Sequence, residues 1–123
     1  MFKFRMLLGL LFVTAAVQAT PVVTLGTSDD YCVVHCYIRI PFTITHYEST
    51  RNVGMLYCDV DAEATSIMVA NNGEIRTRSI HDSPIGVFKN TAGEIKGAVE
   101  IDTGISKNHF KGSRVKTASC HIP

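Results

Sequence analysis

The stretch that decides the fold is YCVVHCYIRI, residues 31–40. Its side chains would alternate between two faces of an extended chain, with Cys32, Val34, Cys36, Ile38 and Ile40 on one face and Tyr31, Val33, His35, Tyr37 and Arg39 on the other. A period of two over ten residues is typical of a β-strand, whereas a helix repeats every 3.6 residues. We therefore predict one strand over 31–40. Pro41, which has no N–H, should mark an edge position, a bulge or a break.

Strand-like patterns continue on both sides of this stretch. The pattern predicts further strands over 22–27, 42–48, 55–60, 66–70, 75–80, 87–89, 94–102 and 115–122. Asn-Asn-Gly at 71–73 predicts a hairpin turn, and Asn90 to Gly93 predicts a second one. The fold class expected is all-β, a small antiparallel sandwich or barrel of about eight strands. The alternation is like that of an immunoglobulin-type sandwich, but the chain has no tryptophan to complete the Cys-Trp-Cys arrangement of those domains.

The N-terminus has the layout of a secretory signal peptide. Residues 1–19 carry Lys3 and Arg5, then an apolar stretch, then Val17 and Ala19 at the −3 and −1 positions of a cleavage site. The apolar stretch is about 12 residues long, short of the roughly 20 that a membrane-spanning helix needs. We therefore predict cleavage after Ala19, a single domain over 20–123 with no membrane span, and a secreted protein, either extracellular or periplasmic.

All four cysteines, Cys32, Cys36, Cys58 and Cys120, follow the predicted cleavage site. An even number in a short exported chain predicts two disulfides, which stabilise a small domain. On one continuous strand, Cys32 and Cys36 would lie about 13 Å apart, beyond the roughly 7 Å Cα separation that a disulfide allows. If the segment were a loop, Cys32–Cys36 and Cys58–Cys120 would be the obvious pairs, so the connectivity stays open.

Charge and motifs exclude several function classes. Without Lys3 and Arg5 the chain carries ten basic and eleven acidic side chains, a balance that does not favour nucleic-acid binding. No G-x-S-x-G motif and no closely spaced histidine pattern is present, so no catalytic residue, metal site or cofactor is expected. Asp59, Asp61 and Glu63 are interpreted as a solvated strand face, and His81-Asp82 as part of a turn.

One predicted strand face combines residue types that protein interfaces favour. It carries Tyr31, His35, Tyr37 and Arg39, and tyrosine and arginine bury large areas while keeping a polar group. We predict these four as binding residues; the alternative is ordinary cross-strand packing. A basic segment over 107–116 is a second, weaker candidate.

These observations predict a secreted or periplasmic binding module of the inhibitor, immunity or effector type, whose partner is another protein. Absent catalytic motifs argue against an enzyme. Two alternatives remain open: a small hydrolytic or metal-dependent enzyme assembled from scattered side chains, and a structural subunit that assembles by strand addition.

Overall fold

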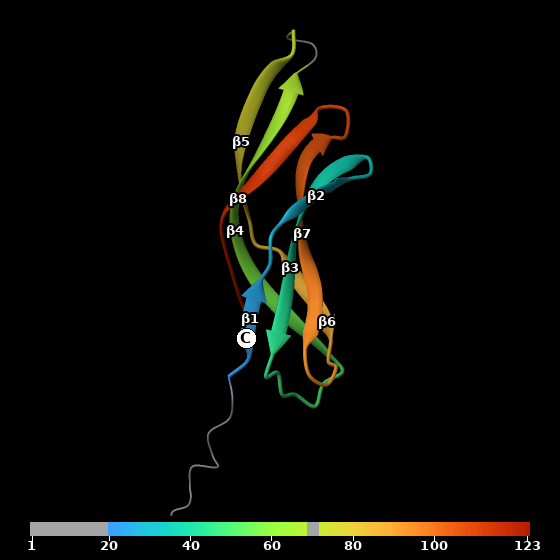
Figure 1. Cartoon of the computed structure of the whole chain (residues 1–123), viewed down its shortest axis with the longest axis vertical. Helices are drawn as coiled ribbons and strands as arrows, with labels where there is room; N and C mark the ends of the chain where they lie inside the picture. The colour runs from blue at the N-terminus through green and yellow to red at the C-terminus, as the bar shows by residue number, and fades with distance from the viewer. Residues whose placement is uncertain (1–19, 69–71) are drawn as a thin grey trace, which may run out of the picture.

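A computed structural model describes residues 20–68 and 72–123, and Figure 1 shows that this part of the chain is built from strands alone. Within these residues, eight strands form two antiparallel sheets and there is no helix. The predicted all-β class and the predicted strand number are confirmed. The predicted signal peptide, residues 1–19, lies outside the described residues.

The first sheet, here called sheet 1, is organised around β3 (His35–Thr45). Strand β7 (Ile95–Ser106) pairs along one side of β3. The other side is shared by two short strands placed end to end, β2 (Asp29–Cys32) and β1 (Val22–Leu25).

The second sheet, sheet 2, repeats this plan around β4 (Val53–Met68). Strand β8 (Phe110–His121) pairs along one side of β4. The other side is again shared by two strands, β6 (Ile85–Lys89) and β5 (Glu74–Asp82). In each sheet, therefore, one long strand is the template that aligns all the others.

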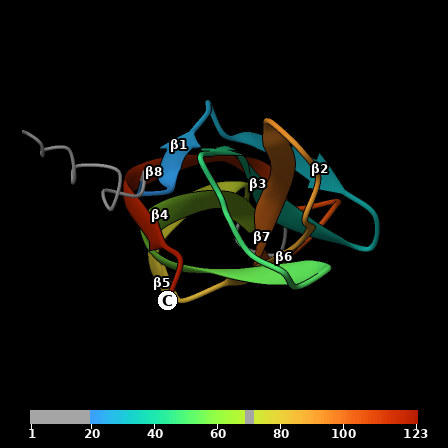
Figure 2. The ribbon, with the colours of Figure 1, turned by 90° about the horizontal axis from the view of Figure 1, so that it is seen from below.

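The two sheets face each other over a single apolar core. Viewed along the long axis, β1 lies beside β8 and β6 lies beside β7, so the sandwich closes on both sides (Figure 2). The alternation of the central strands supplies the core, whose largest fully buried side chains include Ile38, Phe42, Ile44, Leu56 and Ile101. The buried polar side chain among the described residues is Thr103, whose hydroxyl donates to the carbonyl oxygen of Cys36 at 2.7 Å.

The predicted single strand over 31–40 is wrong at its first third. The chain reverses at Val33 and Val34, so that β2 and β3 form a hairpin in which Tyr31 lies opposite Tyr37. The tip is closed by a hydrogen bond from the Val33 amide to the carbonyl oxygen of His35, at 3.0 Å. Two valines continue the alternation and no glycine, asparagine or proline marks the reversal, which is why the turn is invisible to a pattern of period two.

This reversal decides the disulfides. It places Cys32 opposite Cys36, with Cα atoms 4.0 Å apart, and the two are bonded. In sheet 2, Cys58 of β4 lies opposite Cys120 of β8, and these form the second disulfide. Both predicted disulfides are present, and no described cysteine is free. Of the pairings left open above, the structure has the one expected if the segment between Cys32 and Cys36 is a loop.

Pro41 lies inside β3 and interrupts nothing. Its carbonyl accepts from the Gly26 amide at 2.8 Å, so the backbone polar groups of Pro41 point toward the break between β1 and β2. A missing N–H at that place costs no ladder hydrogen bond. β3 therefore continues through Pro41, and the break lies beside it, between β2 and β1.

Of the two predicted hairpins, one is confirmed. Strands β4 and β5 pair directly, and Asn72 and Gly73 have the positive φ angles of 58° and 78° that their residue types favour. The second is wrong: β6 pairs with β4 and β7 pairs with β3, so the segment 90–94 carries the chain from one sheet to the other. Strands β6 and β7 are joined by a short connection, as in a hairpin, because they lie side by side at neighbouring edges of the two sheets.

Candidate functional site

The outer face of sheet 2 exposes a contiguous group of large apolar side chains. We call it the apolar patch, and it consists of Val53 (49% exposed), Met55 (44%), Tyr57 (37%), Ile85 (51%) and Val87 (65%). The register of β4 and β6 places Met55 opposite Val87 and Tyr57 opposite Ile85. The five residues therefore form one surface of cross-strand neighbours, not scattered exposed side chains.

Both faces of this end of β4 are apolar, and only one can face the core. Gly54 and Leu56, which alternate with the patch residues, are buried. Gly54 has no room for a side chain, since a Cβ there would lie 2.4 Å from the Phe88 ring. The inner face is thus filled by Phe88 and Leu56, and the second set of apolar residues is left to solvent.

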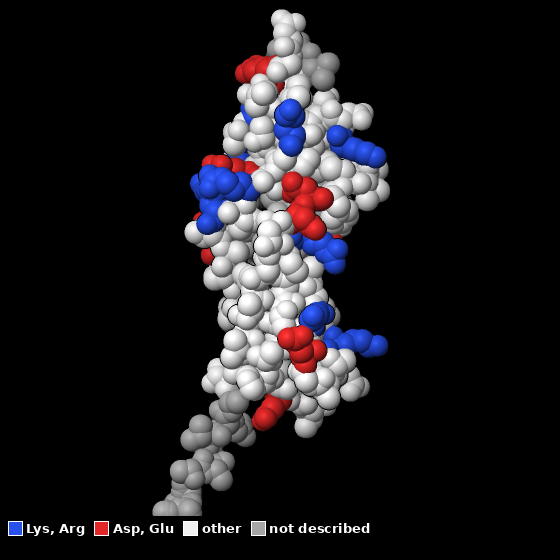
Figure 3. Space-filling view, viewed as in Figure 1, with Lys and Arg blue, Asp and Glu red and all other residues white. Residues whose placement is uncertain are grey.

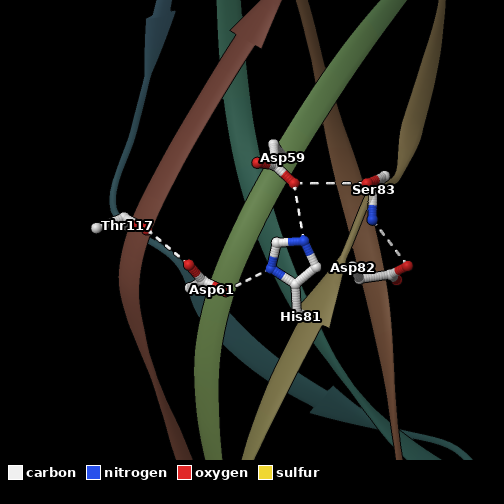
Figure 4. A network of polar contacts seen from close by, with 6 residues as sticks. All are labelled: Asp59, Asp61, His81, Asp82, Ser83 and Thr117. Carbon is white, nitrogen blue, oxygen red and sulfur yellow. Dashed lines mark hydrogen bonds and ion pairs between the residues drawn. The ribbon is translucent and has the colours of Figure 1, made fainter.

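Further along the same outer face, a histidine joins two carboxylates (Figure 4). The Nδ1 atom of His81 on β5 lies 2.5 Å from Asp61 Oδ1, and its Nε2 atom lies 3.3 Å from Asp59 Oδ1. The register explains the contact, because Asp61 of β4 lies directly opposite His81. The hydroxyl of Thr117 on β8 donates to the second oxygen of Asp61, Oδ2, at 3.5 Å. The hydroxyl of Ser83 donates to Asp59 Oδ1, the same oxygen that faces His81, also at 3.5 Å.

The geometry of this network selects the charged form of His81. An ionised carboxylate only accepts hydrogen bonds, so a histidine with a carboxylate at each ring nitrogen satisfies both only as the doubly protonated imidazolium. The hydrogen bond to Asp61, followed by the charges of Asp61 and Asp59, raises the pKa of His81 above 6.5. The same hydrogen bond lowers the pKa of Asp61 below 3.8.

The network does not have the arrangement of a catalytic triad. In a triad, one histidine nitrogen faces the nucleophile and accepts its proton, whereas both nitrogens of His81 face carboxylates. Ser83 Oγ contacts Asp59 rather than the imidazole. Within the described part of the chain, no group of three or more His, Cys, Asp or Glu side chains has a geometry that could hold a metal ion.

A cleft of about 780 Å³ adjoins the other end of the apolar patch. It lies between β4, the loop that connects β3 to β4, and the segment that follows β8. Its lining is Pro21, Tyr47, Glu48, Ser49, Arg51, Val53, Gly54, Met55, Tyr57, Ile122 and Pro123. The volume is in the range of small-molecule and peptide sites, and the cleft shares Val53, Met55 and Tyr57 with the patch.

The four predicted binding residues lie together on the outer face of sheet 1. Tyr31 and Tyr37 stack, with ring centroids 5.3 Å apart at 21°, while His35 and Arg39 are exposed. Two acidic residues of β7 lie beside them, Glu100 opposite Arg39 and Asp102 opposite Tyr37. A hydrogen bond to Glu100 raises the pKa of Tyr31 above 10.0.

This group is thus a mixed polar surface on the side of the molecule opposite the patch. On the face shown in Figure 3, charged side chains of both signs gather in the upper half, and a largely uncharged stretch lies over β1. The basic segment 107–116 is mostly the start of β8, where Arg114 is paired with Glu63 at 3.0 Å.

The apolar patch was missed from the sequence, although a signal for it exists. Residues 53–57, VGMLY, are apolar at every position, and Ile85 and Val87 repeat this beside Gly86 and Phe88. A strand buried on one face should alternate with polar residues. A strand that is apolar on both faces needs a further layer of structure on each face to be fully buried. In a sandwich of two sheets only the inner face of each sheet is covered, so the outer apolar side chains of such a strand are exposed.

Comparison with known proteins adds no family: no family model, no curated protein and no solved structure matches this chain significantly. Over residues 20–68 and 72–123 there is no helix of the length and apolar character needed to cross a membrane. The two disulfides indicate an oxidising compartment.

Proposed function

We propose that this chain is an exported binding module that acts by contact with another protein, through the outer face of sheet 2. The observation that carries the proposal is the apolar patch. Soluble monomeric proteins rarely expose large contiguous apolar patches, and such patches, when bordered by polar residues, mark interaction sites. Here the border is formed by the His81 network at one end and by the charged rim of the cleft at the other.

The scaffold suits this role. The patch lies on paired strands of a disulfide-bonded sheet, so its side chains are held in place before a partner arrives, which lowers the ordering cost of association. The signal-like segment 1–19 supports export of the domain. Aromatic and methionine side chains, represented by Tyr57 and Met55, are enriched at the centres of interfaces.

The test is recovery of the partner from the native surroundings with wild-type protein and patch variants. Val87→Lys introduces a charge at the most exposed patch position, and we expect it to reduce partner recovery at least tenfold, since charges are disfavoured at the centre of an interface. Val22→Lys is the control, because Val22 is likewise an exposed valine (49%, against 65% for Val87) but lies on β1 of sheet 1. Unchanged melting temperatures in both variants establish intact folding. Equal recovery by both variants would contradict the proposal.

A further inference from the structure

Sheet 2 has an open strand edge beside the apolar patch. Strand β8 ends at His121, which lies opposite Tyr57, whereas β4 continues for four more residues to Val53. On that side, no described strand pairs with residues 53–56 of β4. The other side of the same segment is fully paired with β6.

The backbone groups that face this open edge can be assigned. The Cys58 amide donates to Pro84 O at 3.1 Å, and the Asn90 amide donates to Asn52 O at 2.8 Å. Even-numbered residues at this end of β4 therefore direct their N–H and C=O groups toward β6. Because the direction alternates along an antiparallel strand, Val53 and Met55 direct theirs into the opening.

The opening coincides with the 780 Å³ cleft, whose lining includes Val53 and Met55. Its lining also includes Ile122, Pro123 and Tyr47. The ring of Tyr47 packs edge-on against Phe88, with the ring centroids 5.1 Å apart. An unpaired strand edge that opens into a cleft offers backbone hydrogen-bond partners to an extended segment.

The rim of the cleft carries charges that can complement one end of a bound segment. Glu48 and Arg51 are exposed at the cleft, and neither forms an ion pair with another residue of the described chain. A segment antiparallel to β4, in line with β8, would run with its C-terminal end toward Arg51. A negative charge at that end complements the guanidinium, which favours bidentate contact with carboxylates.

We propose that the cleft binds an extended segment of the partner protein by strand addition to β4. The segment runs antiparallel to β4, exchanges backbone hydrogen bonds with Val53 and Met55, places apolar side chains beside theirs on the patch face, and ends in an acidic group at Arg51. Main-chain hydrogen bonds supply affinity and alternate side chains supply specificity in this mode of recognition. The inference rests on the proposed function, since it names the part of the partner that the site takes.

The probe is a phage-displayed library of random twelve-residue peptides selected against the disulfide-bonded chain, with the enriched sequences made as synthetic peptides. We expect alternating apolar residues followed by an acidic residue. In a ¹⁵N NMR titration, the largest amide shifts should fall on Val53 and Met55. No enrichment, or shifts centred elsewhere, would overturn the proposal.

Three variants distinguish binding at the open edge of β4 from binding at the apolar patch. Val53→Pro removes one edge N–H at the first residue of a strand, where proline is tolerated, and should weaken peptide binding about tenfold. Arg51→Glu should weaken it about tenfold by charge repulsion. Lys107→Glu makes the same change of charge at an exposed position between β7 and β8, outside the cleft lining, and should leave it unchanged. The edge proposal would be refuted if Val53→Pro and Arg51→Glu had no effect on peptide binding. If Val87→Lys still reduced recovery of the native partner, the proposed function would stand.

Discussion

His81 and Asp61 lie directly opposite each other on β5 and β4, with imidazole Nδ1 2.5 Å from the carboxylate Oδ1. They are 20 residues apart in the chain, and the β4–β5 register alone brings them together. The pair, extended by Asp59, forms a pH-sensitive contact at the border of the apolar patch.

The pair should make the stability of the protein depend on pH. The pKa of His81 is raised above 6.5, so its contribution is complete below pH 6.5 and is lost as the pH rises through the folded-state pKa. The pKa of Asp61 is lowered below 3.8, so its contribution is present above pH 3.8 and is lost as the pH falls through the folded-state value. We therefore expect the His81–Asp61 contribution to be greatest between these two limits.

The measurement is the melting temperature of wild type and His81→Gln across this range, with an NMR titration of the imidazole. The variant should lose the part of the pH dependence above pH 6.5, since glutamine cannot become charged. Because the pair is exposed to solvent, added salt should reduce the difference. Parallel curves for the two proteins, or a His81 pKa below 6.5, would show that the contact does not exist in solution.

The two disulfides should contribute unequally to stability. Cys58–Cys120 closes a loop with a sequence separation of 62, and Cys32–Cys36 one of 4. In the chain-entropy model these correspond to about 4 and about 2 kcal/mol of unfolding free energy. Urea unfolding of the two double-alanine variants checks the order. A larger loss from removing Cys32–Cys36 would mean that its hairpin is required for the fold as a whole.

Thr103 should be sensitive to the loss of its hydroxyl. The side chain is fully buried, donates to Cys36 O at 2.7 Å and accepts from the Ile105 amide at 3.2 Å. Thr103→Val keeps the shape but leaves both backbone groups without this partner, so we expect a loss of about 1–3 kcal/mol in urea unfolding. Thr103→Ser keeps the hydroxyl and is the control. If the serine variant is the less stable of the two, the lost methyl matters more than the hydrogen bonds.

The predicted surface on sheet 1 is testable independently of the patch. If Tyr31, His35, Tyr37 and Arg39 contact the partner, Arg39→Ala should weaken binding by about 1–3 kcal/mol with little change in melting temperature. Tyr37→Ala should also reduce stability, because Tyr37 is half-buried and stacks on Tyr31. Unchanged affinity in both variants, with a lower melting temperature for Tyr37→Ala, would assign the surface to cross-strand packing. Binding that stays constant between about pH 5 and 8 would remove His35 from the contact.

Periodicity was sufficient for the fold class and for the inner face of each central strand. Ile38 and Ile40 of β3 and Leu56 and Val60 of β4 are buried as the alternation predicts. Alternation is a local property, since neighbouring side chains of an extended chain always point to opposite sides. The same local reading failed at Val33, where a reversal without turn residues continued the pattern.

Which strands pair, and therefore which residues meet, depends on contacts between distant segments. The alternating pattern says that β6 and β7 are strands but cannot say that each belongs to a different sheet. It also treats His81 and Asp61 as unrelated, because a contact across a ladder is set by register and not by spacing along the chain. The exposed patch and the open edge beside Val53 arise in the same way. Strand identity follows from nearest-neighbour geometry, while the site follows from where β8 ends relative to β4, a relationship that exists only once the sheet is assembled.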